Sequence, residues 1–178
     1  MSDLSIRAPR PDDAEAIAAI YAPYVRDTTI SFEVDPPAVA TMRERIAAIV
    51  ERYPYLVAKR DGVVVGYAYA GPFRSRAAYR WTVETTVYVD RALGGQGIGR
   101  ALYQTLLDRL TALGFVSAIG IIALPNTGSV GLHERLGFTQ VGTEKGVGYK
   151  FGGWHDVGVW QRDLAPRQDR PREPRHPM

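Results

Sequence analysis

The sequence contains no cysteine. A disulfide bond, a thiolate metal site and a cysteine nucleophile each require this side chain, so all three are excluded. We therefore expect a protein without a bound metal. The lack of disulfides also suits a reducing compartment.

Long apolar runs are lacking as well. No stretch approaches the roughly 18 apolar residues that a membrane-spanning helix needs. The first residues place Asp3 and Arg7 around a short apolar stretch, without the long apolar segment of a signal peptide. We expect a soluble, cytoplasmic protein that does not bind a membrane.

A strong charge of one sign is also missing from the main part of the chain. The formal net charge is +3, and residues 165–178 supply +2 of it through four arginines, one aspartate and one glutamate. The remaining +1 is too small for a nucleic-acid-binding surface. We therefore expect no nucleic acid as a partner; a nucleic-acid-binding or ribosome-associated protein is suggested only by the basic tail.

The chain is long enough for one folded domain. Its 178 residues are 46% apolar, which is enough to form a buried core. Residues 165–178 contain four prolines and no periodic pattern, which predicts a disordered tail. We expect a single domain over residues 1–164.

Periodicity predicts the order of the elements. The strands are expected at 4–8, 55–60, 63–69, 81–89, 115–124, 138–141 and 155–162, and helices are expected to start near 11, 35, 98 and 130. Asp35 is the expected cap of the second helix, whose residues Val39, Met42, Ile46 and Ile49 should face inward. Asp61-Gly62 predicts a two-residue hairpin. This order predicts an α/β fold with helices on both faces of a sheet.

The glycine cluster Gly94-Gly95-Gln96-Gly97-Ile98-Gly99-Arg100 joins a predicted strand to a predicted helix. Such a loop presents free amides to phosphate oxygens. A Walker loop is excluded because Arg100-Ala101 replaces the required Lys-Ser/Thr, and a dinucleotide fingerprint is excluded because the third glycine is missing. A tight strand-to-helix turn without a ligand is the alternative.

Two motifs carry a family resemblance. The x-x-Gly-x-Gly loop is similar to the pyrophosphate loop of the GNAT superfamily of N-acetyltransferases, although Gly94 stands where that family usually has Arg or Gln. The stretch from Asn126 to Phe138, Asn-x-x-Ser-x-x-Leu-His-Glu-x-Leu-Gly-Phe, resembles the second motif of the same family. The resemblance implies acetyl-CoA as co-substrate and the GNAT fold, with a central mixed, mostly antiparallel sheet flanked by helices.

A narrower resemblance covers most of the folded part. Ser31-Phe32-Glu33, Phe73-Arg74-x-Arg76-x-x-Tyr79-Arg80, Thr82-Val83-Glu84 and Val147-Gly148-x-Lys150-Phe151-Gly152-x-Trp154-x-Asp156 resemble the phosphinothricin and methionine sulfone acetyltransferase branch. This resemblance implies acetyl transfer to the α-amine of a small amino acid with a tetrahedral phosphinate, sulfone or sulfoximine group, and a homodimer. It also assigns Lys150 and Trp154 to substrate or dimer contacts.

Two residues are candidates for catalysis. An amine attacks a thioester only when it is neutral, so an ammonium group must first lose a proton, and Glu84 is our candidate for the base, acting through water. The alternative for Glu84 is a structural ion pair with Arg74, Arg76 or Arg80. His133 stands where most of the superfamily has a tyrosine that acts as general acid, so it is a candidate to protonate the thiolate. The alternative for His133 is packing or capping of its helix.

The binding residues follow from the same motifs. Backbone amides of Val87 to Val89 are expected to hold the thioester carbonyl, and Asn126 the pantetheine amides, although Asn126 can also be a turn residue. Phe32 is equally a core residue, and arginines in a loop are often only solvated. The cofactor-binding residues are expected to be Val87, Tyr88, Val89, Gly94, Gly95, Gln96, Gly97, Ile98, Gly99, Arg100, Asn126 and Ser129, and the substrate-binding residues Phe32, Glu33, Phe73, Arg74, Arg76, Glu84, Thr85 and Thr86.

Other functions stay open at this point. A coenzyme A sensor or inactive acetyltransferase would keep the glycine loop and lose the base, and the presence of Glu84 argues against it. Acetylation of a peptide or protein N-terminus, or of another small amine, is the alternative among enzymes.

Overall fold

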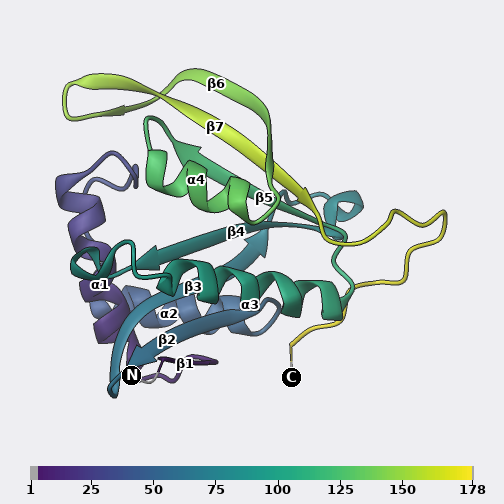
Figure 1. Cartoon of the computed structure of the whole chain (residues 1–178), viewed down its shortest axis with the longest axis horizontal. Coiled ribbons are helices and arrows are strands. Elements are labelled where there is room, and N and C mark those ends of the chain that lie inside the picture. Colours follow the sequence, from purple (N-terminus) through teal and green to yellow (C-terminus); the bar gives the residue numbers. More distant parts are fainter. Residues whose placement is uncertain (1–3, 178) are drawn as a thin grey trace.

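The computed structural model describes residues 4–177, which form one seven-stranded sheet and four α-helices (Figure 1). The strands are β1 (Leu4–Arg7), β2 (Tyr55–Arg60), β3 (Val63–Pro72), β4 (Thr82–Val89), β5 (Ser117–Ala123), β6 (Thr139–Lys150) and β7 (Gly153–Asp163). The helices are α1 (Asp13–Asp27), α2 (Val39–Val50), α3 (Ile98–Leu113) and α4 (Thr127–Arg135). Short 3-10 turns at Ala77–Tyr79 and Arg91–Leu93 flank β4.

The strand order is β1-β2-β3-β4-β5-β7-β6. Only β4 and β5 pair in parallel; the other neighbouring strands are antiparallel. The mixed, mostly antiparallel sheet that the resemblance implied is therefore confirmed.

Helices cover both faces of this sheet. Alternate residues of a strand point to opposite faces, and the two hydrophobic cores follow that alternation. Leu56, Ala58 and Ala68 pack against α3, whereas Val57 and Tyr67 pack against α1 and α2. In Figure 1, α3 and α4 lie on the near side of the sheet and α1 and α2 on the far side.

The hairpin at Asp61-Gly62 is confirmed. Both residues have positive φ, 50° and 84°, as a two-residue turn between β2 and β3 requires. The start of α2 differs from the prediction: the helix begins at Val39 with Ala38 as its N-cap, so Asp35 does not cap it. A residue that precedes proline disfavours helical dihedrals, and Asp35 and Pro36 each precede a proline. The later start also leaves Val39 exposed, contrary to expectation.

The last two strands are longer than predicted. β6 and β7 form a hairpin that turns at Phe151-Gly152, whereas the sequence indicated only 138–141 and 155–162. Most of β6 is exposed, so no alternation of apolar and polar residues marks it as a strand. Lys150 anchors the hairpin: its buried ammonium donates to the carbonyl oxygens of Val25 and Ser31 at 2.6 and 2.7 Å. This contact fixes the segment after α1 beside the hairpin.

The tail after Ala165 has no helix or strand in the part that the structure describes, which ends at residue 177. Several hydrogen bonds and ion pairs join it to the body of the protein, among them an ion pair between Glu173 and Arg80. The indole nitrogen of Trp81 donates to the carbonyl of Arg172 at 2.8 Å, and the amide of Arg175 donates to the carbonyl of Leu113 at 2.8 Å. Its predicted disorder stays a prediction.

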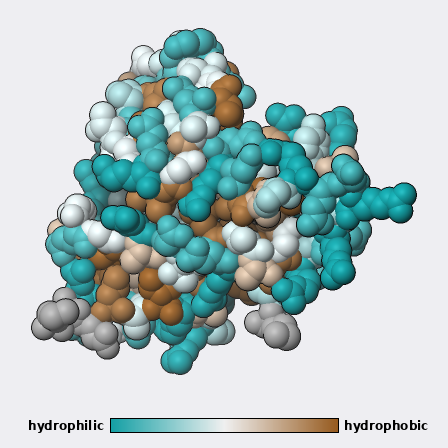
Figure 2. Space-filling model, turned by 45° about the vertical axis from the view of Figure 1, so that its right-hand side comes forward, coloured by the Kyte–Doolittle hydropathy of each residue, from teal (hydrophilic) through white to brown (hydrophobic). Residues whose placement is uncertain are grey.

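The surface is mainly hydrophilic. Figure 2 shows separate hydrophobic areas among hydrophilic residues on the face that it presents. No helix within residues 4–177 is long and apolar enough to cross a membrane.

Candidate active site

The site begins at a gap between β4 and β5. These strands pair only from Thr82 to Glu84, opposite Ser117 to Ile119. β4 continues to Val89 along β3, and β5 continues to Ala123 along β7. The two strands therefore separate beyond Glu84, and backbone groups of β4 face the gap without a strand partner.

A groove of about 470 Å³ runs from this gap to the start of α3. It is lined by all twelve residues that we expected to bind acetyl-CoA: Val87, Tyr88, Val89, Gly94, Gly95, Gln96, Gly97, Ile98, Gly99, Arg100, Asn126 and Ser129. The glycine cluster and the Asn126 motif, about 27 residues apart in sequence, thus line the same groove because α4 packs beside α3.

The glycine loop forms the anion-binding end of the groove. Gly97 is the N-cap of α3 with φ of 80°, and Gly95 also has a positive φ of 77°. An added Cβ at either position would meet no atom within 4 Å, so space is open above the backbone. The free amides at the start of α3 point toward that space, and the helix dipole favours an anion there.

Two arginines add positive charge to the same groove. Arg100 was expected there, whereas Arg135 of α4 was not. No sequence motif marked Arg135 as a residue of the groove, because its position depends on how α4 packs. The side chain of Gln96 accepts a hydrogen bond from Arg60 of β2, so that side chain is held by the neighbouring hairpin.

Asn126 is a turn residue at the start of α4, which is one of the two roles that the sequence indicated for it. Its side-chain oxygen accepts a hydrogen bond from the amide of Ser129 at 3.1 Å and caps α4. Asn126 nevertheless lines the groove, so capping places it at the position expected for pantetheine contacts.

His133 lies in a buried chain of hydrogen bonds. Its Nδ1 is 2.8 Å from the carbonyl oxygen of Ser129, which can only accept, so Nδ1 carries the hydrogen. Its Nε2 then accepts from the hydroxyl of Tyr103 at 2.9 Å, and that hydroxyl is 2.6 Å from Thr85 Oγ1. Burial lowers the pKa of His133, which keeps the ring neutral. These contacts support the packing alternative for His133.

A second pocket, which we call the acceptor pocket, has a volume of about 460 Å³. It contains the expected substrate residues Phe32, Glu33, Glu84, Thr85 and Thr86, and His133 also lines it. The acceptor pocket shares a wall with the groove, formed by Ile30, Val87, Tyr88, Asn126 and Ser129. Two ligands bound in the two spaces would meet at the gap in the sheet.

Glu84 stands at this junction as a partly buried carboxylate. No ion pair or side-chain hydrogen bond joins Glu84 to another residue among 4–177, so the expected alternative of an arginine pair is not seen there. Burial raises the pKa of Glu84. Gly71 of β3 pairs with Glu84 of β4, and a Cβ atom added to Gly71 would meet no atom within 4 Å. Open space therefore borders the carboxylate.

The remaining predicted substrate residues lie outside the acceptor pocket. Phe73 and Arg74 line a neighbouring pocket of about 600 Å³, and the exposed Arg76 lines neither. The Arg74 guanidinium lies 4.8 Å from the ring centre of Phe73 and 5.3 Å from that of Tyr79. Thr82 lines this neighbouring pocket and is two residues from Glu84 on β4, on the same face of the sheet. The two pockets are therefore neighbours: Thr82 and Glu84, one from each pocket, lie about 7 Å apart along the strand.

Three tyrosines of the site were not predicted as site residues. Tyr21 of α1 and Tyr69 of β3 line the acceptor pocket, and Tyr24 lines the groove and donates to the carbonyl of Val89 at 2.6 Å. Tyr21 and Tyr24 keep the spacing of a helix face, which does not separate a core residue from a residue that lines a site. Among residues 4–177 no group of three or more metal-ligating side chains is present.

Comparisons with known proteins agree with this geometry. Residues 6–159 match the family model described as an acetyltransferase (GNAT) domain. Phosphinothricin N-acetyltransferase of Streptomyces viridochromogenes is 45% identical over 172 residues, which are 96% of this chain and 94% of that protein. The L-methionine sulfoximine/L-methionine sulfone acetyltransferase of Pseudomonas paraeruginosa is 38% identical, over 94% of this chain and 98% of the relative.

A solved structure shows the same arrangement. The GNAT superfamily phosphinothricin acetyltransferase of Sinorhizobium meliloti, determined in complex with AcCoA, superposes with a TM-score of 0.92 at 38% identity, over 98% of this chain and 96% of that one. The family model covers most of the chain, and these relatives match it nearly end to end. The chain belongs to the GNAT family of acetyltransferases.

Proposed function

We propose that this protein transfers the acetyl group of acetyl-CoA to the α-amine of a small amino acid or analogue, of the phosphinothricin, methionine sulfone or methionine sulfoximine type. The proposal rests on one observation above all. The groove with the glycine loop and the pocket with Glu84 share a wall at the gap between β4 and β5. That geometry supports direct attack of the amine on the thioester within a ternary complex.

Glu84 takes one proton of the ammonium group, directly or through water. Its raised pKa makes it a stronger base than an exposed glutamate. The backbone amides of residues 87–89 hold the carbonyl oxygen, where negative charge develops as the carbon–nitrogen bond forms. As the carbon–sulfur bond breaks, the second proton of the nitrogen passes to the thiolate. His133 and Tyr103 position Thr85 and the wall of β4 rather than supply that proton.

The experiment that tests this function is a thiol-release assay with acetyl-CoA and a panel of amino acids that includes the three analogues. We expect release of coenzyme A that depends on the acceptor, with formation of the N-acetyl amino acid. A protein that binds acetyl-CoA but transfers nothing to any acceptor is a sensor and contradicts the proposal. Transfer only to peptide N-termini favours the alternative substrate class.

We propose that Arg74, which lines the neighbouring pocket, and the exposed Arg76 bind the carboxylate or the tetrahedral group of an acceptor that extends beyond the acceptor pocket. Replacement of Arg74 by alanine is expected to raise the Michaelis constant for the amino acid about tenfold, because a charge-assisted hydrogen bond contributes roughly 1.5–3 kcal/mol. The affinity for acetyl-CoA should stay unchanged. Arg76→Ala tests the second arginine in the same way.

The control is Arg43→Ala, which removes the same charge from the exposed face of α2. Steady-state kinetics gives the Michaelis constant, and calorimetry gives the affinity for acetyl-CoA. If all three variants behave like the wild type, the arginines are merely solvated and the carboxylate is bound elsewhere.

We also propose a homodimer. The β6/β7 hairpin carries three exposed aromatic side chains: Tyr149 and Phe151, each 62% exposed, and Trp154, 69% exposed. Such an exposed hydrophobic cluster is costly in water and is typical of an interface. We expect a dimer in sedimentation velocity and a shift toward monomer in Trp154→Arg, but no shift in Lys145→Ala on the same hairpin. A monomeric wild type would exclude this interface.

We propose that the protein acts in the cytoplasm without a nucleic-acid or membrane partner. The near-neutral charge outside the tail and the absence of cysteine support this proposal. Cell fractionation tests it, and recovery in the membrane fraction would contradict it.

A further inference from the structure

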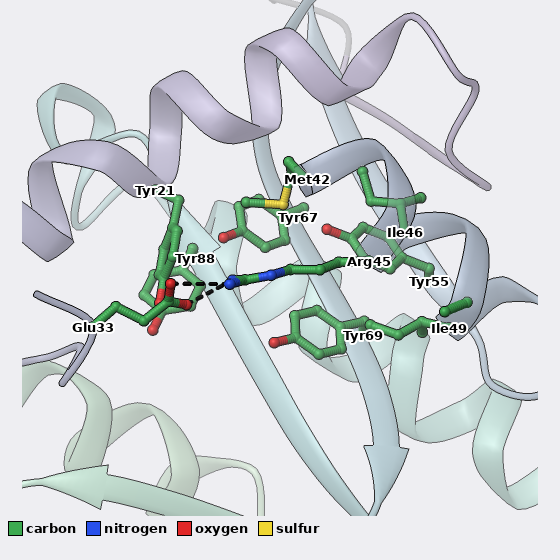
Figure 3. A pocket seen from close by; sticks show the side chains of 11 residues that line it. Tyr21, Glu33, Met42, Arg45, Ile46, Ile49, Tyr55, Tyr67, Tyr69 and Tyr88 are labelled. Atoms are coloured by element: carbon green, nitrogen blue, oxygen red, sulfur yellow. Dashed lines mark hydrogen bonds and ion pairs between the residues drawn. The ribbon is translucent and has the colours of Figure 1, made fainter. Parts of the chain in front are cut away.

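Another cavity, distinct from the groove and from the two pockets described above, adjoins the acceptor pocket on the side of α1 and α2. It has a volume of about 290 Å³, and five tyrosines dominate its lining: Tyr21, Tyr55, Tyr67, Tyr69 and Tyr88. We call it the tyrosine cavity (Figure 3). Met42, Ile46 and Ile49 of α2 complete one wall. The proposed reaction uses none of this space.

The strand register places the tyrosines side by side. Tyr55 of β2 pairs with Tyr69 of β3, and Tyr67 of β3 pairs with Tyr88 of β4. The rings of Tyr55 and Tyr69 are 5.1 Å apart at 10°, and those of Tyr67 and Tyr69 are 6.4 Å apart at 8°. These nearly parallel rings form a floor against which another aromatic group can pack edge-on or offset.

Two hydroxyl groups in this floor lack a partner. The side chains of Tyr55 and Tyr67 are 4% and 2% exposed, and no hydrogen bond to either hydroxyl occurs within residues 4–177. Neither hydroxyl oxygen is fully shielded, so each can pair with a polar atom of a bound ligand in place of water. Burial raises the pKa of both phenols well above its ordinary value, so each remains a neutral donor. In Figure 3 the hydroxyl ends of Tyr55, Tyr67 and Tyr69 point toward the side where Glu33 lies.

The charges at the rim of the cavity neutralise each other. Arg45 reaches from α2 to Glu33 and donates two hydrogen bonds to its carboxylate, at 2.6 and 3.1 Å (Figure 3). Tyr21 donates a third at 2.9 Å. Burial opposes ionisation of Glu33, but the hydrogen bonds from Arg45 and Tyr21 outweigh it and lower the pKa of that carboxyl. A charged guest would lose its hydration without gaining a free counter-charge, so a neutral guest is favoured.

The tyrosine cavity adjoins the acceptor pocket. Tyr21, Glu33, Tyr69 and Tyr88 line both spaces. Glu84 and Tyr69 lie on adjacent strands and face the same side of the sheet, with the open space above Gly71 between them. An amino acid whose amine lies near Glu84 can therefore extend its side chain past Tyr69 into the cavity.

We propose that the tyrosine cavity binds the side chain of an uncharged aromatic amino-acid acceptor, and that the hydroxyls of Tyr55 and Tyr67 pair with a polar atom of that side chain. The enzyme then acetylates aromatic L-amino acids in addition to the small analogues. This inference rests on the proposed function, because it places the amine of the same acceptor at Glu84. No change in the chemistry of transfer is involved.

The test measures kcat/KM for L-phenylalanine, L-tyrosine, L-tryptophan, L-glutamate and methionine sulfone in the wild type and in four variants. Tyr55→Phe and Tyr67→Phe remove only the hydroxyls, so each should lower kcat/KM about tenfold for tyrosine or tryptophan and leave phenylalanine nearly unchanged. Ile49→Trp fills the cavity and should lower kcat/KM for all three aromatic acceptors at least tenfold, but not for methionine sulfone. Tyr53→Phe removes the hydroxyl of a tyrosine that packs against Phe115 and does not line the tyrosine cavity or the acceptor pocket, so it is the matched control and should change nothing.

The outcomes separate this inference from the proposed function. Acetylation of methionine sulfone without acetylation of the aromatic acceptors overturns the inference and leaves the proposed function standing. Failure of every acceptor overturns both. Equal losses for methionine sulfone and the aromatic acceptors in Ile49→Trp, or a preference for glutamate over the aromatic acceptors in the wild type, also overturn the inference.

Discussion

Replacement of Glu84 by glutamine is expected to lower the turnover number about 100- to 10,000-fold, the usual contribution of a positioned base. Glutamine keeps the shape of the side chain and cannot accept the proton. Binding of acetyl-CoA should persist, because the groove is built from other residues. Stopped-flow or steady-state thiol release measures the turnover number, and calorimetry measures binding.

The pH profile gives an independent readout of the same residue. The base must be deprotonated, so the turnover number of the wild type should fall as the pH drops through the raised pKa of Glu84. In Glu84→Gln the reaction depends on free amine already in solution, whose pKa is near 8, so the acidic limb should move to higher pH. An unchanged profile with near-full turnover would make Glu84 a structural residue.

Stability should distinguish a catalytic role from a structural one. A carboxyl whose pKa is raised by folding binds protons more tightly in the folded state, so its ionised form costs stability above the unfolded pKa. Glu84→Gln should therefore be at least as stable as the wild type at neutral pH. The exposed Glu44 of α2 offers the control substitution, Glu44→Gln, which should affect neither turnover nor stability.

The second large effect is expected at Gly97. Replacement by valine is expected to weaken acetyl-CoA binding about 10- to 100-fold, because a β-branched residue is strained by about 1–3 kcal/mol at φ of 80° and its side chain enters the space above the loop. Isothermal titration calorimetry of the folded variant measures this loss.

Gly62→Val provides a matched control for backbone strain. Gly62 has φ of 84° in the β2–β3 turn, with nothing within 4 Å of an added Cβ, and it does not line the groove. This variant should be less stable than the wild type but should bind acetyl-CoA normally. Unchanged affinity in Gly97→Val would mean that the glycine loop is only a turn, and the assignment of the groove would be lost.

Local patterns predicted much of the fold. Asp61-Gly62 can adopt two positive φ angles and so fixed the first hairpin, and the glycine cluster located the start of α3. The exposed half of the β6/β7 hairpin was missed because exposed strands lack alternation. The prediction that Asp35 caps α2 was wrong, because the two prolines that follow Asp35 disfavour helical dihedrals there despite its favourable side chain.

The site was less predictable where residues act through distant contacts. Nine of the twelve groove residues lie in the glycine cluster and the Asn126 motif, and the other three lie on β4 just before the cluster, so motif order predicted their proximity. Arg74 and Arg76 were predicted as substrate-binding residues from their chemistry and from the family resemblance, but Arg74 lines the neighbouring pocket and Arg76 lines neither pocket. The tyrosine cavity combines α1, α2 and three strands, and no local pattern reveals how those elements meet.

Two-substrate steady-state kinetics tests direct transfer at the junction of the groove and the acceptor pocket. Velocities measured over a grid of acetyl-CoA and methionine sulfone concentrations should give intersecting reciprocal plots, because both ligands must be bound before transfer, and mass spectrometry should identify the N-acetyl amino acid. Parallel plots, or coenzyme A release at the same rate with and without the amino acid, would contradict a shared site at Glu84.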